Sequence, residues 1–417
     1  MAEVKDFKAY ADKLNKIIES DEELPEESFD ESPVRETSYK EKIRSHKLRV
    51  FFRTVIIAAV TIFFVAAVYI SWRDKEYSEA VISTGSSITN GADAKVISLS
   101  GHIVQYSKDG ISCLDESGQV LWNQTYEMQS PIAHTCQSIV AVGDYNGHNI
   151  YVNSVSGSLG QVDTNLPIRD FCVSSQGVVA AVLDGKDVTW IYLYDSQGNT
   201  LANFKTTMKD SGYPIDISIS PNAELVCVSY LYPEDGQVKT SVAFFNFGSV
   251  GQNAIDNYAS GFDYPGEVVP YVQFMNSSAS FAISDARIMF YSGDEKPIIK
   301  SESFTGNEEI RSVYFSDSYV GLVFANSTDE GAYRLQVYNE SGAIILTTYF
   351  DMDYTEIIFD KNQFVIYNED ECVIKDMKGH DKFKGTFDKP VRTMAATGAR
   401  NKFILVTASS VDTYVLK

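Results

Sequence analysis

The chain has 417 residues, of which 44% are hydrophobic and 12% aromatic, with 25 Tyr and 24 Phe but 3 Trp. This length exceeds that of one small domain, and the composition favours a large core built from β-structure. The net charge of −21 argues against nucleic acid as a partner, because a nucleic-acid-binding surface must be basic to neutralise phosphates. We therefore expect partners with neutral or positively charged surfaces.

The first 49 residues are expected to form a cytoplasmic tail. Apolar residues at helical spacing in residues 1–20 predict a short amphipathic helix. This helix is interpreted either as a docking site for a cytoplasmic partner or as a solvated tail with transient structure. The acidic, proline-containing segment Ser20–Pro33 predicts a disordered linker.

A long apolar segment follows at Val50–Ile70, with Arg53 as its one charged residue. Its length of about 20 residues is what a helix needs to cross a hydrocarbon core of about 30 Å. Seven Lys and Arg residues lie in residues 35–53, which predicts a cytoplasmic N-terminus. The alternative is a cleavable signal peptide, whose apolar region is normally shorter and ends in small residues. We expect a single-span plasma-membrane anchor over residues 50–72, followed by an extracytoplasmic domain over residues 76–417.

From Lys95 to the end of the chain, short apolar strands alternate with turns that mostly open on Asp or Asn and close on Gly. In such a turn the Asp or Asn side chain accepts hydrogen bonds from the backbone, and Gly takes the positive φ. The turns recur at roughly 37 to 50 residues, the period of a β-propeller blade. They are Asp115–Gly118, Asn153–Gly157, Asp195–Gly198, Asn246–Gly248, Ser292–Asp294, Asn339–Gly342 and Asp376–Gly379.

A second pattern marks the start of the innermost strand of each blade, where Pro or a β-branched residue precedes an apolar run. The last unit, Val391–Lys417, supplies three strands, and the strand-like segment Ala80–Ser87 precedes the first full unit. Pairing these two segments would complete the last blade and close the ring without an exposed edge. The sequence therefore predicts an all-β fold, a β-propeller of eight blades, with seven blades as the alternative. The expected starts are Pro131, Pro167, Pro214, Pro270, Ile310, Tyr354 and Pro390.

The segment GHIVQYSKDGISCLDESGQVLW, which ends at Trp122, resembles the PQQ-like repeat of quinoprotein propellers, and the whole domain resembles WD40-like propellers. The combination of acidic tail, single span and propeller also resembles an uncharacterised clostridial family of membrane-anchored proteins with a domain of unknown function. These resemblances imply fold and location and add no chemistry. Quinoprotein dehydrogenases stack their cofactor with tryptophan and a vicinal disulfide, and this chain has no adjacent Cys pair, so no cofactor is expected.

The sequence holds no GxSxG, HExxH, P-loop or zinc-ligand spacing. His134 lies on an expected inner strand, where a hydrogen-bonded structural role is favoured over a catalytic one. Asp144–Asn149 places oxygen ligands at alternate positions, as a calcium site would, although a hairpin turn uses the same residue types. We expect no catalytic or metal-binding residue and no enzymatic activity. Five cysteines are expected to be mostly buried free thiols, namely Cys113, Cys136, Cys172, Cys227 and Cys372.

The loops between the second and third strands of each blade should lie on the same side of the ring as the loops between blades. These loops are acidic and contain Tyr and Phe, which predicts a rim that attracts basic partners, or one that merely keeps the domain soluble. The insertion Gly248–Val269 is longer than a blade needs, and long loops are often functional. The candidate partner-binding residues are in this insertion: Tyr258, Phe262, Asp263, Tyr264 and Glu267.

These observations lead to the hypothesis of a non-enzymatic protein–protein interaction scaffold at the cell envelope. The alternative is a ligand- or carbohydrate-binding sensor domain, because exposed aromatic residues beside loops also form sugar platforms. A propeller enzyme is the third possibility in order of preference.

Overall fold

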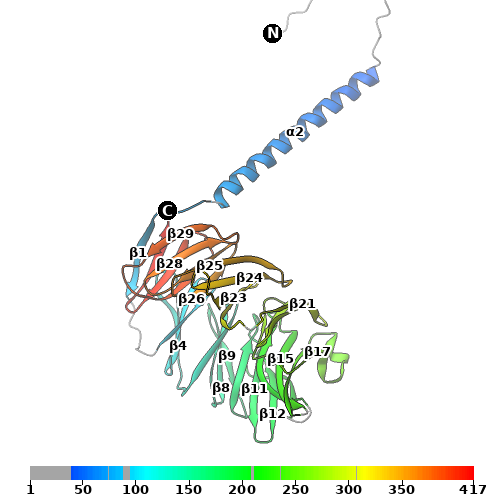
Figure 1. Ribbon diagram of the computed structural model, residues 1–417, viewed down its shortest axis with the longest axis vertical. Coiled ribbons are helices and arrows are strands. Elements are labelled where there is room, and N and C mark those ends of the chain that lie inside the picture. The colour runs from blue at the N-terminus through cyan, green and yellow to red at the C-terminus, as the bar shows by residue number, and fades with distance from the viewer. Residues whose placement is uncertain (1–38, 74, 88–93, 208–210, 235, 307) are drawn as a thin grey trace, which may run out of the picture. The chain divides into compact units, whose positions relative to one another are not determined.

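A computed structural model describes residues 39–73, 75–87, 94–207, 211–234, 236–306 and 308–417 (Figure 1). The chain divides into two compact units, one that ends at Asp74 and one over Lys75–Lys417. The first unit contains α2 (Tyr39–Arg73), and the second contains the described β-strands. The amphipathic helix and the acidic linker expected before residue 34 lie outside the described residues.

Helix α2 is 35 residues long and combines the basic segment and the apolar segment in one element. Its stretch His46–Tyr69 has 24 residues with a mean hydropathy of 2.4 and is not buried by other parts of the described chain. A helix needs about 20 apolar residues to cross a bilayer. By length and composition, α2 is therefore able to span a membrane.

The described residues of the second unit form eight four-stranded sheets, in which neighbouring strands pair antiparallel. We number these sheets as blades 1 to 8 in chain order. This arrangement confirms the eight-bladed propeller. The strands of blades 1 and 2 are β2 (Lys95–Leu99), β3 (His102–Tyr106), β4 (Gly110–Leu114), β5 (Val120–Thr125), β6 (Pro131–Cys136), β7 (Ile139–Asp144), β8 (Asn149–Ser154) and β9 (Gly157–Asp163).

The remaining blades repeat the same up-and-down order, with the first strand innermost. Blades 3 and 4 are β10 (Ile168–Val173), β11 (Val179–Gly185), β12 (Val188–Tyr194), β13 (Thr200–Thr206), β14 (Tyr213–Ile219), β15 (Leu225–Glu234), β16 (Gln237–Asn246) and β17 (Tyr258–Pro265). Blades 5 and 6 are β18 (Tyr271–Phe274), β19 (Ala279–Ile283), β20 (Arg287–Ser292), β21 (Ile298–Phe304), β22 (Ile310–Phe315), β23 (Tyr319–Ala325), β24 (Tyr333–Asn339) and β25 (Ile344–Phe350). Blades 7 and 8 are β26 (Glu356–Asp360), β27 (Gln363–Tyr367), β28 (Glu371–Asp376), β29 (Asp381–Thr386), β30 (Val391–Ala396), β31 (Lys402–Thr407), β32 (Ser410–Leu416) and β1 (Ala80–Ser87).

Blade 8 joins the two ends of the propeller sequence, as expected. Strand β1 pairs antiparallel with β32, in the register Ala80 opposite Leu416 and Ile82 opposite Tyr414, and Figure 1 shows β1 beside the C-terminus. Just before β1, the Ser78 N–H donates to the carbonyl of Lys417, and the Lys417 N–H donates to the carbonyl of Glu79. The first strand of the domain therefore supplies the outer strand of the last blade.

The core is distributed over the eight contacts between neighbouring blades. In β11, Val179 and Ala181 pack in the cluster shared with blade 2, whereas Ala180 and Val182 pack in the cluster shared with blade 4. Because each blade lies between two others, its middle strands are apolar on both faces, and the sequence there shows a continuous apolar run. The cluster that closes the ring joins Ile103 and Leu114 of blade 1 to four buried residues of blade 8, namely Ala395, Ile404, Val406 and Val411.

The repeated turns join the third and fourth strands of their blades. In the first turn, Asp115 Oδ1 accepts hydrogen bonds from the N–H groups of Ser117 at 2.8 Å and Gln119 at 2.9 Å, and Gly118 has φ +81°. Trp122, which follows this turn, donates from its indole Nε1 to the carbonyl of Val155 in the turn of blade 2. Ser260 and Ser301 make comparable bonds to the next blade with their hydroxyls. The contact between blades thus persists where tryptophan is absent.

Candidate functional site

The segment Gly248–Val269 is not an additional loop, which corrects the expectation from sequence. Its second half is β17, the outer strand of blade 4, and it pairs with β16. The turn between these strands contains two short 3₁₀ helices, Gly251–Asn253 and Ile255–Asn257. The Gly, Asp and Pro residues in YASGFDYP suggest a loop, but an outer strand tolerates them because one of its edges has no strand partner.

Three of the five candidate residues in this segment have structural contacts toward blade 5. Tyr264 is 5% exposed, and its hydroxyl lies 2.8 Å from that of Tyr291. Phe262 packs against the cluster between blades 4 and 5. Glu267 accepts hydrogen bonds from the guanidinium of Arg287. These three side chains are therefore poorly placed to touch a partner.

The other two candidate residues are exposed on the face of blade 4 that is turned toward blade 3. Tyr258 is opposite Phe245 and Asp263 is opposite Ser241 in the β16–β17 register. Tyr258 is 51% exposed, and the side chain of Asp263 is 55% exposed. Asp263 also forms an ion pair of 3.0 Å with Lys239. Partner binding by Tyr258 and Asp263 stays a prediction.

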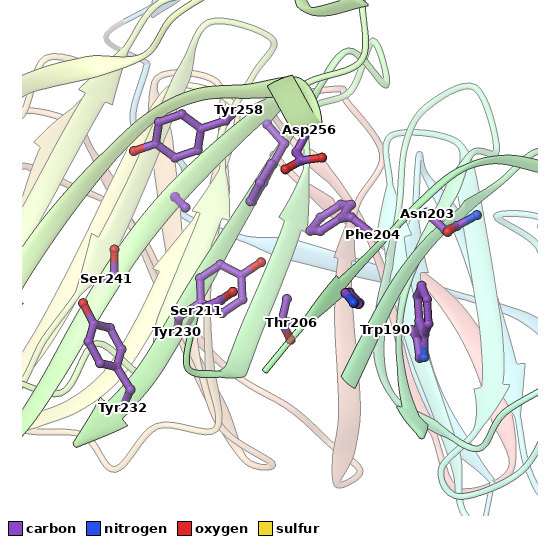
Figure 2. A pocket seen from close by; sticks show the side chains of 13 residues that line it. Trp190, Asn203, Phe204, Thr206, Ser211, Tyr230, Tyr232, Ser241, Asp256 and Tyr258 are labelled. Carbon is purple, nitrogen blue, oxygen red and sulfur yellow. The ribbon is translucent and has the colours of Figure 1, made fainter. Parts of the chain in front are cut away.

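A groove of about 830 Å³ lies between blades 3 and 4. Figure 2 shows Phe204 and Thr206 of β13 on one side, and Tyr230, Ser241 and Tyr258 of blade 4 on the other. The strands β15 and β16 have 10 residues each, compared with 7 each for β11 and β12 in blade 3. The longer hairpin leaves part of the blade 4 face uncovered.

The groove walls are aromatic and carry hydroxyl groups. The rings of Phe204 and Phe245 have centroids 4.5 Å apart and bridge the two blades, and Phe245 also contacts Tyr258, with centroids 6.1 Å apart. Tyr230 lines the groove and is 3% exposed. Its hydroxyl is buried without a hydrogen-bond partner among the described residues, and burial raises its pKa well above the ordinary value. Such unpaired buried groups are uncommon in folded proteins.

The sequence did not reveal this groove, although two signals for it are present. The apolar run of β15 extends through Leu231 and Tyr232, beyond the usual strand length, and β16 begins as early as Gln237. Tyr258 was identified, but as part of a loop. Recognising the groove requires knowing that β13 stands opposite the blade 4 face, and strand patterns do not contain that information.

The loop face, defined as the side with the loops between second and third strands and between blades, is acidic over blades 5 to 7. The described residues of its loops in these blades, 284–286, 305–309, 326–332, 351–355, 368–370 and 387–390, include one exposed lysine, Lys389. Arg334 on β24 pairs with Glu308, and Arg311 on β22 pairs with Glu309. The exposed acidic residues of these loops are Asp285, Glu308, Glu309, Asp329, Glu330, Asp351, Asp353, Glu369, Asp370 and Asp388.

A row of titratable side chains lies on the inner strands of blades 2, 3 and 4. His134 is on β6, as expected for an inner strand, and Asp170 and Asp216 follow on β10 and β14. Burial raises the pKa of Asp170 to about 6 and that of Asp216 to about 7. Asp216 Oδ2 accepts a hydrogen bond of 2.5 Å from the N–H of Val272 on the inner strand of blade 5.

In the segment Asp144–Asn149, whose spacing also suits a calcium site, Asp144 and Asn146 use their side-chain oxygens for hydrogen bonds within the protein. Asp144 Oδ1 accepts from the N–H groups of Gln129 and Ser130, and Asn146 Oδ1 accepts from Arg169. Within the described ranges, no group of three His, Cys, Asp or Glu side chains is placed to hold a metal ion. The segment therefore has the contacts of a hairpin turn.

The five cysteines are free thiols, which confirms that part of the expectation. Four are buried, and Cys136 is half-buried. Burial raises the pKa of Cys113 and Cys136 to about 11. These thiols act as small apolar groups within and between blades.

A model of the family described as "Family of unknown function (DUF5711)" matches residues 73–416. No curated protein matches the chain. The C-terminal WD40 domain of Sif2 superposes with a TM-score of 0.52 at 10% identity, covering 81% of this chain and 98% of that one. BamB from Moraxella catarrhalis has a TM-score of 0.45 at 11% identity, covering 81% of this chain and 100% of that one. Sqt1 from Saccharomyces cerevisiae has a TM-score of 0.48 at 11% identity, with 82% and 99% covered. At 10% identity the likeness to the Sif2 domain shows the propeller fold alone.

Proposed function

The chain belongs to the DUF5711 family, whose function is unknown, and from its own surface we propose that it is a protein-interaction scaffold at the cell envelope. In this proposal α2 crosses the plasma membrane once, with the N-terminus in the cytoplasm and the propeller outside. The apolar stretch His46–Tyr69 and the basic residues before it support this orientation. The proposal assigns no catalytic activity to the propeller.

The acidic loop face over blades 5 to 7 is the observation that carries this proposal. Ten exposed carboxylates in these described loops, against one exposed lysine and the two arginines that pair with Glu308 and Glu309, create a negative potential on a rigid surface. Such a field attracts a partner of opposite charge and increases the rate of association. The proposed partner is therefore a protein with a basic surface.

The test is recovery of crosslinked partners from native membranes, using the full-length protein and a variant with four neutralised loop-face charges. This variant combines Asp329→Asn, Glu330→Gln, Glu369→Gln and Asp370→Asn. A matched control neutralises four exposed acidic residues in turns on the opposite side of the ring, namely Asp294→Asn, Glu295→Gln, Asp317→Asn and Glu340→Gln.

We expect recovery of the partner to fall with the loop-face variant, to persist with the control, and to weaken as salt concentration rises. Equal recovery with both variants would show that the loop face is not the docking surface. Protease accessibility of the propeller in intact cells tests the orientation, because a cytoplasmic propeller would be protected.

A further inference from the structure

The groove between blades 3 and 4 has the dimensions of a ligand site. Its volume of about 830 Å³ falls within the range of roughly 300–1,000 Å³ that is typical of small-molecule and cofactor sites. Its walls belong to different blades, Phe204 to blade 3 and Phe245 to blade 4, and these rings are in contact. The aromatic wall is therefore held by two packed sheets.

The side chains of the groove combine aromatic rings with hydroxyls and carry little charge. Among the described residues that line it, Lys205 and Asp256 are the two charged ones. The flat rings offer surfaces for stacking, and the hydroxyls both donate and accept hydrogen bonds. The rings are Trp190, Phe204, Tyr230, Tyr232, Phe245 and Tyr258, and the aliphatic hydroxyls are Thr206, Ser211 and Ser241.

Tyr230 supplies an independent indication that the groove receives a polar ligand. Figure 2 shows its ring among the groove side chains, with the hydroxyl toward the space between the two blades. This hydroxyl is buried with no hydrogen-bond partner in the described protein, although the residue is 3% exposed. A buried phenol without a partner is unfavourable for the unliganded fold, and a ligand hydroxyl placed in the groove would satisfy it.

We infer that this groove is a binding site for a neutral oligosaccharide. A sugar ring has an apolar C–H face that stacks on an aromatic ring and hydroxyls around its edge that bond to Ser, Thr and Tyr. The lining has both features beside each other, with Tyr230 directly opposite Ser241 in the β15–β16 register. The site lies apart from the acidic loops of blades 5 to 7, so the propeller can hold a glycan and a protein partner independently.

The first part of the test measures binding by the detergent-solubilised full-length protein. The probes are neutral hexasaccharides of glucose with β-1,4 or α-1,4 linkage, of xylose and of N-acetylglucosamine, each titrated to millimolar concentration and followed by calorimetry. We expect at least one probe to bind. If none of these probes binds, the inference is wrong.

The second part uses variants that separate the site from the fold. Phe204→Ala should abolish binding by removing the wall shared by both blades. Tyr230→Phe should weaken binding by about tenfold while leaving the melting temperature equal to or above that of the wild type, because the removed hydroxyl has no partner among the described residues. A simple folding defect would lower the binding affinity and the melting temperature together.

The matched control is Tyr349→Phe, on β25 of blade 6, which should leave glycan binding unchanged. Undiminished binding by Phe204→Ala and Tyr230→Phe would place the glycan elsewhere and overturn the assignment. Glycan binding that persists in the loop-face variant with four neutralised charges would support the site even if the protein-scaffold proposal failed. If an extended peptide bound in the groove and none of the glycans did, the assignment of an oligosaccharide site would also be overturned.

Discussion

The Nε2 atom of His134 lies 3.8 Å from the Oδ1 atom of Asp170, and the two residues come from neighbouring inner strands of blades 2 and 3. Although 42% of the His134 side-chain surface is reachable by solvent, protein atoms surround the ring, and this desolvation lowers its pKa to about 4. Burial raises the pKa of Asp170 to about 6. Between these two values both side chains are uncharged, so the contact is not an ion pair near pH 5.

Stability should decrease with rising pH because of Asp216. Burial raises its folded-state pKa from 3.8 to about 7, and the backbone hydrogen bond from Val272 opposes this only in part. Because the folded pKa is the higher one, the stabilisation is full below about pH 4 and is lost as pH rises through about 7. Asp216→Asn lacks this carboxyl group. The difference in free energy of unfolding between the variant and the wild type should therefore grow in favour of the variant, by on the order of 2–3 kcal/mol, as the pH rises from about 5 to about 8.

The measurement is urea unfolding of both proteins at each pH, followed by circular dichroism. Comparing the variant with the wild type cancels the opposite contribution of His134, whose lowered pKa removes stability as pH falls below about 6.5. Asp317→Asn, at an exposed position, is the control for the Asp-to-Asn change itself. A constant difference between wild type and Asp216→Asn would contradict the assignment.

Gly85 should be essential for closing the ring. A Cβ atom at this position would overlap the carbonyl oxygen of Val411 and lie 2.7 Å from that of Ser117. Since both obstacles are backbone atoms, Gly85→Ala should lower the free energy of unfolding by about 2–4 kcal/mol. The exposed Ser87→Ala on the same strand should change it by less than about 0.5 kcal/mol. Equal stability of the two variants, measured by urea unfolding, would show that the backbone between blades 8 and 1 can shift to accommodate a Cβ atom at position 85.

The hydroxyl pair of Tyr264 and Tyr291 should stabilise the contact between blades 4 and 5. Tyr264→Phe leaves the buried hydroxyl of Tyr291 without its partner at 2.8 Å, at an expected cost of about 1–3 kcal/mol. The double variant with Tyr291→Phe should recover part of this loss, because both polar groups are then removed. Tyr258→Phe, at an exposed position, serves as the control. A single variant as stable as the wild type would contradict the pairing.

The thiols should be nearly unreactive in the folded protein. At about pH 7.5, a pKa of about 11 for Cys113 and Cys136 reduces the thiolate population by about 100-fold relative to an ordinary cysteine. Maleimide labelling should therefore be slow in the native protein and reach all five cysteines in urea. Rapid native labelling, located by mass spectrometry, would identify a cysteine whose surroundings open in solution.

The fold was predictable because each blade repeats the same local signals. The Asp115 carboxylate and Gly118 form a turn through contacts within five residues, and the sequence shows such contacts directly. The pairing of Ala80–Ser87 with the last blade followed from counting strands, since a three-stranded last blade would leave an edge exposed. The architecture therefore follows from local turn chemistry and from the need to leave no strand edge exposed in the last blade.

The candidate site was less predictable because it depends on contacts between blades. Tyr264 and Tyr258 are similar aromatic residues six positions apart, yet one is buried against blade 5 and the other is exposed toward blade 3. A bulge interrupts the β16–β17 register between Phe244 and Phe245. Simple alternation along the strand therefore does not predict on which side of the sheet each tyrosine lies. Tyr230 likewise becomes notable only when its hydroxyl is seen to have no partner in the described part of the chain.

The strand that completes blade 8 is also the covalent link between the propeller and α2. Any tension along the chain from Arg73 reaches the ring first at Tyr77 and Ser78, which bond to Lys382 and Lys417, and then at the β1–β32 ladder. If a bound partner pulled on the propeller while the helix was held, the β1–β32 ladder would bear the load before the other blades. The strand that closes the ring is thus also the strand that first bears a load applied through α2.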